Sequence, residues 1–497
     1  MLATALLFLA AAAPVPQSDQ AADLFRPSTQ AATLPLDQPG AVRERIVELD
    51  LHLLDGAASA RRLDLELFDG ARVTSERTSV ESAYGGGSVW IGAIPGDEFG
   101  LVVISRVGES VHASIRSGGS LFKVAPAGAG IHRLTAIDES LAPACGTGPD
   151  QEVVSPPQAE ERGGGTQRSA SGPRAVDTMV LYTPQARNGA GGTNGILSLI
   201  NLAISETNIG MATSDVDQRH RLAHVFETTY ADSGDMGQDL SRLRSTNDSY
   251  MSNVHTLRTQ YGADLVALIV NGGQYCGIAY LMTNVSQGFA SSAFSVTLRS
   301  CATGNYTFGH EMGHNMGSAH DRQNASQGAY GYSFGYRTPN SAWRSIMAYS
   351  PGTRVLKWSN PNLTVGGYAF GTANDDNHRS LNTAAPTFST FRAETPPVLA
   401  VDSLVAGSNA SISLSGCSPL GATYLAYSLA GGGPTNSAFG IVDLTPPIRT
   451  VSLSATPAGV VSWSPPVPAG ATGRPVWFQG VDVCSATLSN SIAAVVQ

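Results

Sequence analysis

Residues 308–321 read FGHEMGHNMGSAHD, a stretch in which three histidines and one glutamate stand at fixed intervals. Residues four positions apart lie on the same face of a helix, so His310 and His314 can direct both imidazoles at one ion. Glu311 stands beside the first histidine, where a carboxylate can accept a proton from a water molecule on the metal. The stretch therefore predicts a helix that forms one side of a metal site.

The third histidine must reach the same ion from another direction. Gly317 is suited to end the helix, because glycine readily adopts a positive φ. A sharp turn there would return His320 to the ion. Three neutral imidazoles with one open coordination position are typical of a catalytic zinc site rather than a closed structural one.

A bare H-E-x-x-H motif occurs by chance in many chains, but this chain carries the longer H-E-x-x-H-x-x-G-x-x-H form. Residues 345–349, SIMAY, supply the methionine turn that the longer motif predicts downstream. The two motifs resemble those of the metzincin zinc endopeptidases. Asp321, directly after the third histidine, resembles the reprolysin (adamalysin-like) branch, whereas Tyr349 resembles astacins and serralysins. The best match is a secreted, reprolysin-like metalloprotease, over about residues 175–395.

The resemblance implies a fold and a set of roles. The fold is an α/β catalytic domain, with a mixed twisted sheet, an active-site helix and an irregular lower subdomain. Zn²⁺ is the implied cofactor, and Glu311 is the general base that takes the proton of the zinc-activated water and passes it to the leaving amine. Met347 forms a hydrophobic base beneath the histidines and is not a ligand. Tyr349 either hydrogen-bonds the tetrahedral intermediate or binds the resting zinc. The implied zinc ligands are His310, His314 and His320.

Composition limits the other partners. The 497-residue chain has a net charge of −9 and no basic run, so nucleic acid is not expected to bind. The opening MLATALLFLAAAAPVP is short and apolar and suits a signal peptide over residues 1–20, although no Lys or Arg precedes the apolar run. No later apolar run approaches the roughly 20 residues of a membrane span. We therefore expect a secreted protein that acts on protein or peptide substrates.

The five cysteines divide by segment. Cys276 and Cys301 lie in the metalloprotease segment and Cys417 and Cys484 near the C-terminus, so each couple can form a disulfide in an oxidising compartment. Cys145, in PACGTGPD, stands alone upstream of the catalytic segment. It is either a spare or intermolecular thiol, or a thiolate that occupies the open position on zinc. The second interpretation resembles the cysteine switch of metzincin propeptides, with the propeptide as the inhibitor of its own protease.

The chain is expected to be multidomain. Residues 21–174 are predicted as a β-rich propeptide that ends in a Pro/Gly/Ser-rich activation linker at 155–174. Residues 175–395 follow as the catalytic domain, in the order βαβαβββα, with one polar-faced helix expected at about 238–261. Residues 396–497 are predicted as a small β-sandwich-like domain. Residues 374–378, NDDNH, either bind Ca²⁺ through Asp375 and Asp376 or, as we favour, cap the last helix.

Substrate docking is assigned to a strand that precedes the zinc helix. In metzincins the strand at this place is the exposed edge above the cleft, and Gly277, Ile278 and Ala279 resemble it. An edge strand offers unpaired N–H and C=O groups to which an extended peptide can add. The alternative is an ordinary buried strand.

The function predicted from the sequence is a secreted zinc endopeptidase made as a zymogen held latent by Cys145. Two alternatives stay open. One is a pappalysin-like metzincin of narrow specificity. The other is a non-catalytic adhesin or inhibitor on a metzincin scaffold, which the loss of Glu311 or of a histidine would mark.

Overall fold

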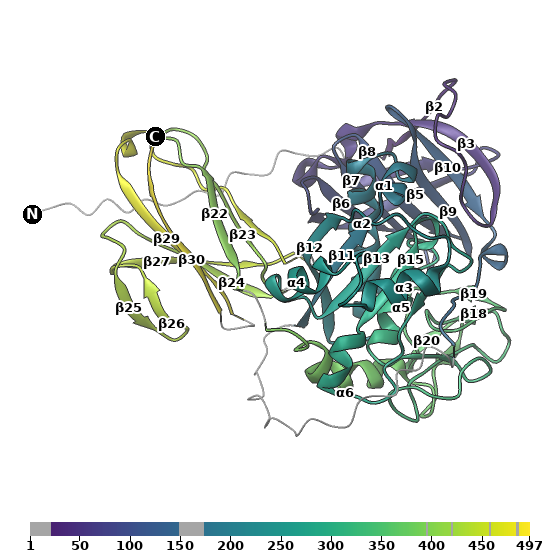
Figure 1. Ribbon diagram of the computed structural model, residues 1–497. Helices are drawn as coiled ribbons and strands as arrows, with labels where there is room; N and C mark the ends of the chain where they lie inside the picture. The colour runs from purple at the N-terminus through teal and green to yellow at the C-terminus, as the bar shows by residue number, and fades with distance from the viewer. Residues whose placement is uncertain (1–20, 149–172, 394–395, 419–420, 457–458, 484–486) are drawn as a thin grey trace, which may run out of the picture.

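The computed structural model describes residues 21–148, 173–393, 396–418, 421–456, 459–483 and 487–497. The fold is multidomain and rich in strands, with a few helices (Figure 1). We refer to residues 21–148 as the N-terminal unit, to 173–393 as the central unit and to 396–497 as the C-terminal unit. The predicted signal peptide and most of the predicted activation linker lie outside the described residues.

The N-terminal unit is one ten-stranded sheet in the order β1-β4-β5-β6-β7-β8-β9-β10-β3-β2. Its apolar face packs around Trp90 and Ile115, which are almost wholly buried. Strand β3 ends at Leu49, and Leu51–Leu54 forms a 3-10 helix. The strands are β1 Ala22–Asp23, β2 Phe25–Pro27, β3 Ala41–Leu49, β4 Arg62–Glu66, β5 Arg72–Ser82, β6 Ser88–Ala93, β7 Leu101–Val107, β8 Ser110–Ser117, β9 Ser120–Gly128 and β10 Ile131–Ile137.

The central unit is built on a five-stranded sheet in the order β12-β11-β13-β15-β14. Its pairs are parallel except for β14 with β15, which is antiparallel and puts β14 at the edge. The predicted order of strands and helices is found. The elements up to the cleft are β11 Arg174–Tyr182, α1 Pro184–Gly189, α2 Thr193–Ala212, β12 Gln218–Glu227, α3 Met236–Arg244, α4 Asn253–Gln260, β13 Leu265–Val270, β14 Gly277–Ala279, β15 Phe294–Leu298 and α5 Thr307–Asn315.

The single helix predicted at 238–261 is wrong, because α3 and α4 are separated by residues 245–252. Two side chains there bond to nearby backbone: Ser245 Oγ accepts from Asn247 N, and Asp248 Oδ1 accepts from Tyr250 N. Such local bonds compete with the helical ladder. The rest of the unit has short strands and one helix: β16 Ala319–Asp321, β17 Phe334–Gly335, β18 Trp343–Arg344, β19 Thr353–Arg354, β20 Asn360–Val365, β21 Tyr368–Phe370 and α6 Asn377–Phe388.

Helix α2 lies between the central sheet and the N-terminal unit (Figure 1). Several of the contacts that its side chains make to the N-terminal unit are polar. Ser205 donates to Glu81 at 2.9 Å, Asn201 accepts from the Tyr84 backbone at 2.8 Å, and the Ser198 hydroxyl lies 2.7 Å from a ring nitrogen of His112. A small apolar patch around Leu202 adds to them.

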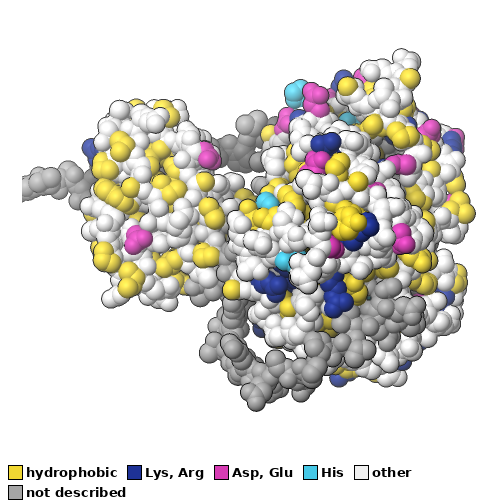
Figure 2. All heavy atoms as spheres, viewed as in Figure 1, with side chains coloured by type: hydrophobic (Ala, Val, Ile, Leu, Met, Phe, Trp, Pro, Cys, Tyr) yellow, Lys and Arg dark blue, Asp and Glu magenta, His cyan; other side chains and the backbone are white. Residues whose placement is uncertain are grey.

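The C-terminal unit has a three-stranded sheet, a four-stranded sheet and a hairpin, and residues of the two sheets share one hydrophobic core. Its charged residues are few, and its visible surface in Figure 2 is mostly uncharged. The predicted Cys417–Cys484 disulfide cannot be described, because Cys484 lies outside the described residues. The strands are β22 Val398–Ser403, β23 Ser411–Ser415, β24 Ala422–Ser428, β25 Pro434–Ser437, β26 Gly440–Asp443, β27 Ile448–Ser454, β28 Val461–Trp463, β29 Pro475–Asp482 and β30 Thr487–Val495.

Candidate metal centre and active-site cleft

Helix α5 and the turn after it bring the three histidines together. The helix ends at Asn315, and Gly317 follows with φ of +95°. A Cβ on Gly317 would lie 2.5 Å from the Cβ of Ala329, so both the conformation and the space there require glycine. The chain then enters β16, which carries His320 back toward the helix.

The three ring nitrogens form a nearly equilateral triangle. The Nε2 atoms lie 3.1 Å apart for His310 and His320, 3.2 Å for His310 and His314, and 3.1 Å for His314 and His320. Zinc held tetrahedrally at its usual Zn–N distance would place its nitrogens about 3.4 Å apart. The arrangement therefore fits one small cation.

The tautomers of His310 and His314 are also those that cation binding requires. The Nδ1 atoms of His310 and His314 donate to the carbonyls of Ile346 and Ser318, each at 2.9 Å. Carbonyls only accept, so the proton of each ring is on Nδ1 and Nε2 presents its lone pair to the centre. Burial lowers the pKa of both histidines and of His320, that of His314 to about 4. The rings are thus neutral, as metal binding requires.

Glu311 lies beside this triangle, wholly buried. Burial raises the pKa of its carboxyl to about 8, against hydrogen bonds from Cys145 and Thr147 to Oε2 that lower it. Among the described residues Oε1 has no partner. Strand β14 passes very close, since a Cβ on Gly277 would lie 2.4 Å from Oε1. A buried carboxylate with one free oxygen beside a cation site is suited to proton transfer.

The end of the N-terminal unit enters the same site. Cys145 Sγ lies 3.6 Å from His314 Nε2 and 3.5 Å from Glu311 Oε2. The thiol and the three histidines offer four ligand atoms within 4.8 Å of one another. Burial and then Glu311 raise the pKa of this thiol, and a divalent cation at the centre would act in the opposite direction.

Residues 144–147 pair with the edge of the sheet. Gly146 N donates to Gly277 O at 2.8 Å, and Cys276 N donates to Ala144 O at 3.0 Å, in a parallel arrangement. Thr147 Oγ1 accepts from Ala279 N at 2.9 Å. From the sequence we expected β14 to be an exposed edge strand. It is buried instead, because residues 144–147 of the same chain bond to its outward-facing backbone groups. The outward-facing backbone N–H groups are those of Cys276 and Ala279.

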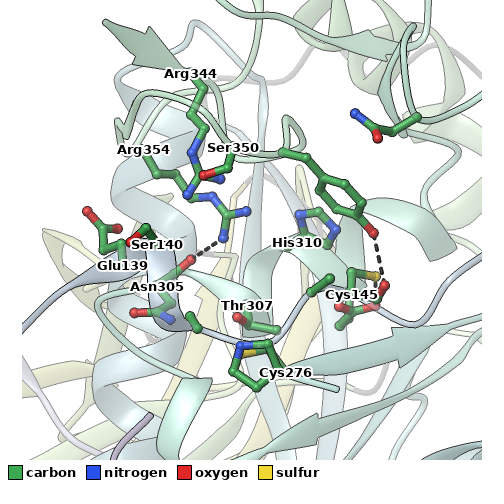
Figure 3. Close-up of a pocket in the computed structure, with 16 residues that line it drawn as sticks. Glu139, Ser140, Cys145, Cys276, Asn305, Thr307, His310, Arg344, Ser350 and Arg354 are labelled. Carbon is green, nitrogen blue, oxygen red and sulfur yellow. Dashed lines mark hydrogen bonds between the residues drawn. The ribbon is translucent and has the colours of Figure 1, made fainter. Parts of the chain in front are cut away.

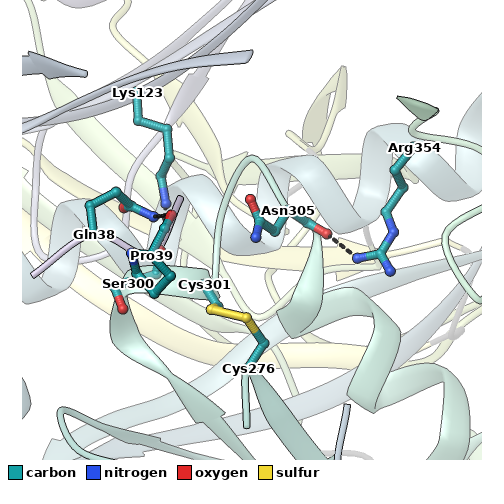
Figure 4. Close-up of a disulfide and its surroundings, with 8 residues drawn as sticks. All are labelled: Gln38, Pro39, Lys123, Cys276, Ser300, Cys301, Asn305 and Arg354. Atoms are coloured by element: carbon teal, nitrogen blue, oxygen red, sulfur yellow. Dashed lines mark hydrogen bonds between the residues drawn. A yellow bond between two sulfur atoms is a disulfide. The ribbon is translucent and has the colours of Figure 1, made fainter. Parts of the chain in front are cut away.

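The predicted Cys276–Cys301 disulfide is confirmed and joins the start of β14 to the segment before α5 (Figure 4). Lys123 of the N-terminal unit donates to the Ser300 carbonyl beside it, at 2.7 Å. The disulfide thus lies where the N-terminal unit meets the edge of the central sheet.

The methionine turn lies beneath the histidines. Met347 is fully buried, and its sulfur approaches Gly313 so closely that a Cβ there would lie 3.0 Å from it. The Tyr349 hydroxyl donates to Cys145 O at 2.9 Å. Asp321 accepts from Tyr349 N and from Arg337, both at 2.9 Å. Asp321, recognised in the sequence only as a branch marker, therefore ties the strand of the third histidine to the methionine turn.

A cavity of about 250 Å³ opens beside His310 and Glu311 (Figure 3). Arg344 and Arg354, which flank the methionine turn in sequence, line it together with Glu139 of the N-terminal unit. Burial lowers the pKa of both arginines, that of Arg344 to about 8, where the neighbouring Arg354 contributes. Neither arginine stands out in the sequence, where the only signal is a cationic residue on each side of residues 345–349.

The calcium alternative is not supported. Asp376 accepts from Arg379 N at 2.9 Å and caps α6, as we favoured. Asp375 accepts from Thr372 and pairs with Arg322 at 2.7 Å. Both carboxylates are thus engaged within the protein.

Comparisons with known proteins agree with this geometry. The model of metallo-peptidase family M12 (Reprolysin_5) matches residues 172–359. A peptidyl-Asp metalloendopeptidase of Stenotrophomonas maltophilia (strain K279a) is 34% identical over 363 residues, which cover 68% of this chain and 85% of the relative. The enzyme of the same name from Xanthomonas campestris pv. campestris is 32% identical over 418 residues, covering 79% and 97%. Metalloproteinase-II from Bacteroides fragilis aligns in structure with a TM-score of 0.32 and 12% identity, over 56% of this chain and 82% of that one.

The fold, the site and these relatives define a metzincin-like zinc metalloprotease. The chain belongs to metallopeptidase family M12. It is a zinc metalloendopeptidase that acts on proteins or peptides, and not a non-catalytic adhesin or inhibitor. In the described part of the chain, no helix is long and apolar enough to cross a membrane.

Proposed function

We propose that the chain is a secreted endopeptidase in which His310, His314 and His320 hold zinc and Glu311 is the general base. The observation that carries this assignment is the triangle of three Nε2 atoms 3.1–3.2 Å apart, with two of the lone pairs fixed toward its centre by Nδ1–H bonds. Secretion is supported by the apolar opening of the sequence and by a disulfide.

The residues divide the chemistry as follows. When bound, zinc supplies a Lewis acid that polarises the scissile carbonyl and acidifies a water molecule. Glu311 takes the proton of that water on its free carboxylate oxygen and delivers it to the leaving amine. The Tyr349 hydroxyl, which donates to the Cys145 carbonyl in this structure, would donate to the scissile carbonyl oxygen as charge develops on it.

The substrate would lie along β14. The backbone groups of Gly277 and Ala279 that now bond to residues 146 and 147 are those an extended peptide would use. The relatives are named for action at aspartate, and we propose the same preference here. A cavity lined by Arg344 and Arg354 beside the metal centre supports it.

Latency would come from the N-terminal unit acting as a propeptide. Cys145 offers a fourth ligand where a water molecule must otherwise bind, and residues 144–147 occupy the edge strand. Cleavage within residues 155–174 would separate this unit from the protease.

The test is Glu311→Ala in the activated enzyme. Zinc content, measured by atomic absorption, should stay at the wild-type value, because all three histidines remain. Peptide turnover should fall by several orders of magnitude. A zinc chelator should abolish wild-type turnover, and added zinc should restore it. A zinc-loaded Glu311→Ala enzyme that cleaves near the wild-type rate would refute the assignment.

A further inference from the structure

The cavity beside the metal centre is lined by two arginines, Arg344 and Arg354, that form no ion pair with any described residue. Arg344 is 5% exposed, and it donates to the carbonyls of Gly352 and Ala348 at 2.8 and 2.7 Å. Arg354 donates to Asn305 O at 2.8 Å. Within the described ranges, no carboxylate oxygen lies within 4.0 Å of either guanidinium, whereas the half-buried Arg337 pairs with Asp321.

Both guanidinium groups keep hydrogen-bonding capacity. Arg354 Nε is buried, and in the described part of the protein it has no partner. The Nη2 of Arg354 makes one long hydrogen bond, to Ala348 O at 3.4 Å. The Nη2 of Arg344 has no acceptor among the described residues. Arginine donors in a fork match a carboxylate in two bonds at once. An anion entering the cavity would find both charge and donors.

The N-terminal unit already places a carboxylate at this cavity. Glu139 lines it (Figure 3). Arg116 donates two bonds to the Glu139 carboxylate, at 2.9 and 3.0 Å. Its negative charge acts on both Arg344 and Arg354 and favours their charged forms. Arg116 and Glu139 belong to the same unit, so they would leave together and free the cavity.

A purely structural role is the competing explanation. Arg344 and Arg354 both reach the Ala348 carbonyl, next to Met347, and could simply brace the methionine turn. Support of the methionine turn requires hydrogen-bond donors, but it does not require a guanidinium charge that faces the cleft without an ion-pair partner. The two roles predict different results when only the substrate is changed.

We propose that Arg354, positioned beside Arg344, is the specificity-determining residue that binds a side-chain carboxylate of the substrate next to the scissile bond. Glu139 is then the internal carboxylate that faces the same arginines in the precursor. This inference rests on the proposed endopeptidase function and assigns its preference to a residue. The same chemistry would bind the C-terminal carboxylate of a peptide, so the test includes both sources.

The experiment compares matched peptides on the activated enzyme. One pair differs only by Asp or Asn at the preferred position, and a second set carries a free or an amidated C-terminus. Arg354→Gln should lower kcat/KM for the Asp peptide by about 10- to 150-fold, the range for a hydrogen bond to a charged group. Cleavage of the Asn peptide should change little. Arg354→Lys should recover part of the preference, and Arg322→Gln, outside this cavity, should leave the Asp-to-Asn ratio unchanged.

Three outcomes would overturn the proposal. Equal losses on the Asp and Asn peptides would assign Arg354 to bracing. An unchanged ratio would place recognition elsewhere. If cleavage depends on a free C-terminus and not on Asp, Arg354 binds the terminal carboxylate of the peptide and not a side-chain carboxylate.

Binding separates this proposal from the proposed function. Calorimetric titration of the Glu311→Gln enzyme should show tighter binding of the Asp peptide than of the Asn peptide, and Arg354→Gln should remove the difference. That result would support the pocket even if Glu311 were not the base. Equal binding of the two peptides would overturn the pocket even in a fully active protease.

Discussion

Replacing Gly277 by alanine should disable the enzyme by moving Glu311, the proposed general base. The added Cβ would lie 2.4 Å from Glu311 Oε1, 2.6 Å from its Cγ and 2.7 Å from its Cδ. Ordinary contacts begin at 3.4 Å, so the carboxylate or the edge strand must move by about 1 Å. A displacement of that size in a catalytic group costs about 10²-fold in rate. Overpacking at a buried site should also lower stability by about 1–3 kcal/mol.

The assay is kcat on a fluorogenic peptide, together with zinc content and the thermal midpoint. We expect kcat to fall about 100-fold with zinc retained, because all three histidines remain in place. Gly331→Ala is the matched control, since a Cβ at Gly331 meets nothing within 4 Å. Near-normal turnover in Gly277→Ala would show that the close approach of β14 to Glu311 does not position the base.

Three further predictions concern the precursor, the edge strand and pH. Cys145→Ala should make the uncut precursor active, measured as peptide cleavage before the linker is cut; a silent variant would leave inhibition to residues 144–147 and the bulk of the N-terminal unit. Ala279→Pro removes an outward backbone donor, so kcat/KM for peptides should fall while zinc content stays constant, and unchanged kinetics would place the substrate elsewhere. Burial raises the pKa of Glu81 from 4.5 to about 7, so between these pH values the folded protein binds one proton more than the unfolded chain. The protonated carboxyl's contribution to the free energy of unfolding, about 3 kcal/mol at most, is therefore lost as pH rises from 4.5 to 7. The thermal midpoint of the full chain should therefore decline more steeply over that range than in Glu81→Gln, and parallel profiles would contradict this.

The grouping of the three histidines could be predicted because their pattern is local. The spacing of His310 and His314 follows from helix geometry alone, and the turn at Gly317 requires only that glycine tolerates a positive φ. The order of strands and helices along the central unit could likewise be predicted, from buried apolar runs such as β13.

What the sequence could not provide depends on contacts between distant segments. Arg344 and Arg354 reach one cavity only because the chain folds back around the methionine turn, and nothing in their spacing indicates it. The covering of β14 depends on Gly146, which lies 131 positions before Gly277. The break between α3 and α4 had a local cause, but a weak one, in side chains that compete with the backbone.

The polar contacts between α2 and the N-terminal unit would have a consequence for the protease once the N-terminal unit is released, as we propose. Ser198, Asn201 and Ser205 exchange one set of hydrogen bonds for another when water replaces His112, Tyr84 and Glu81. The apolar patch around Leu202 would lose its cover at the same time. A helix with such a face can bind the N-terminal unit during folding. After that unit leaves, the polar face can be exposed to solvent without promoting aggregation of the enzyme.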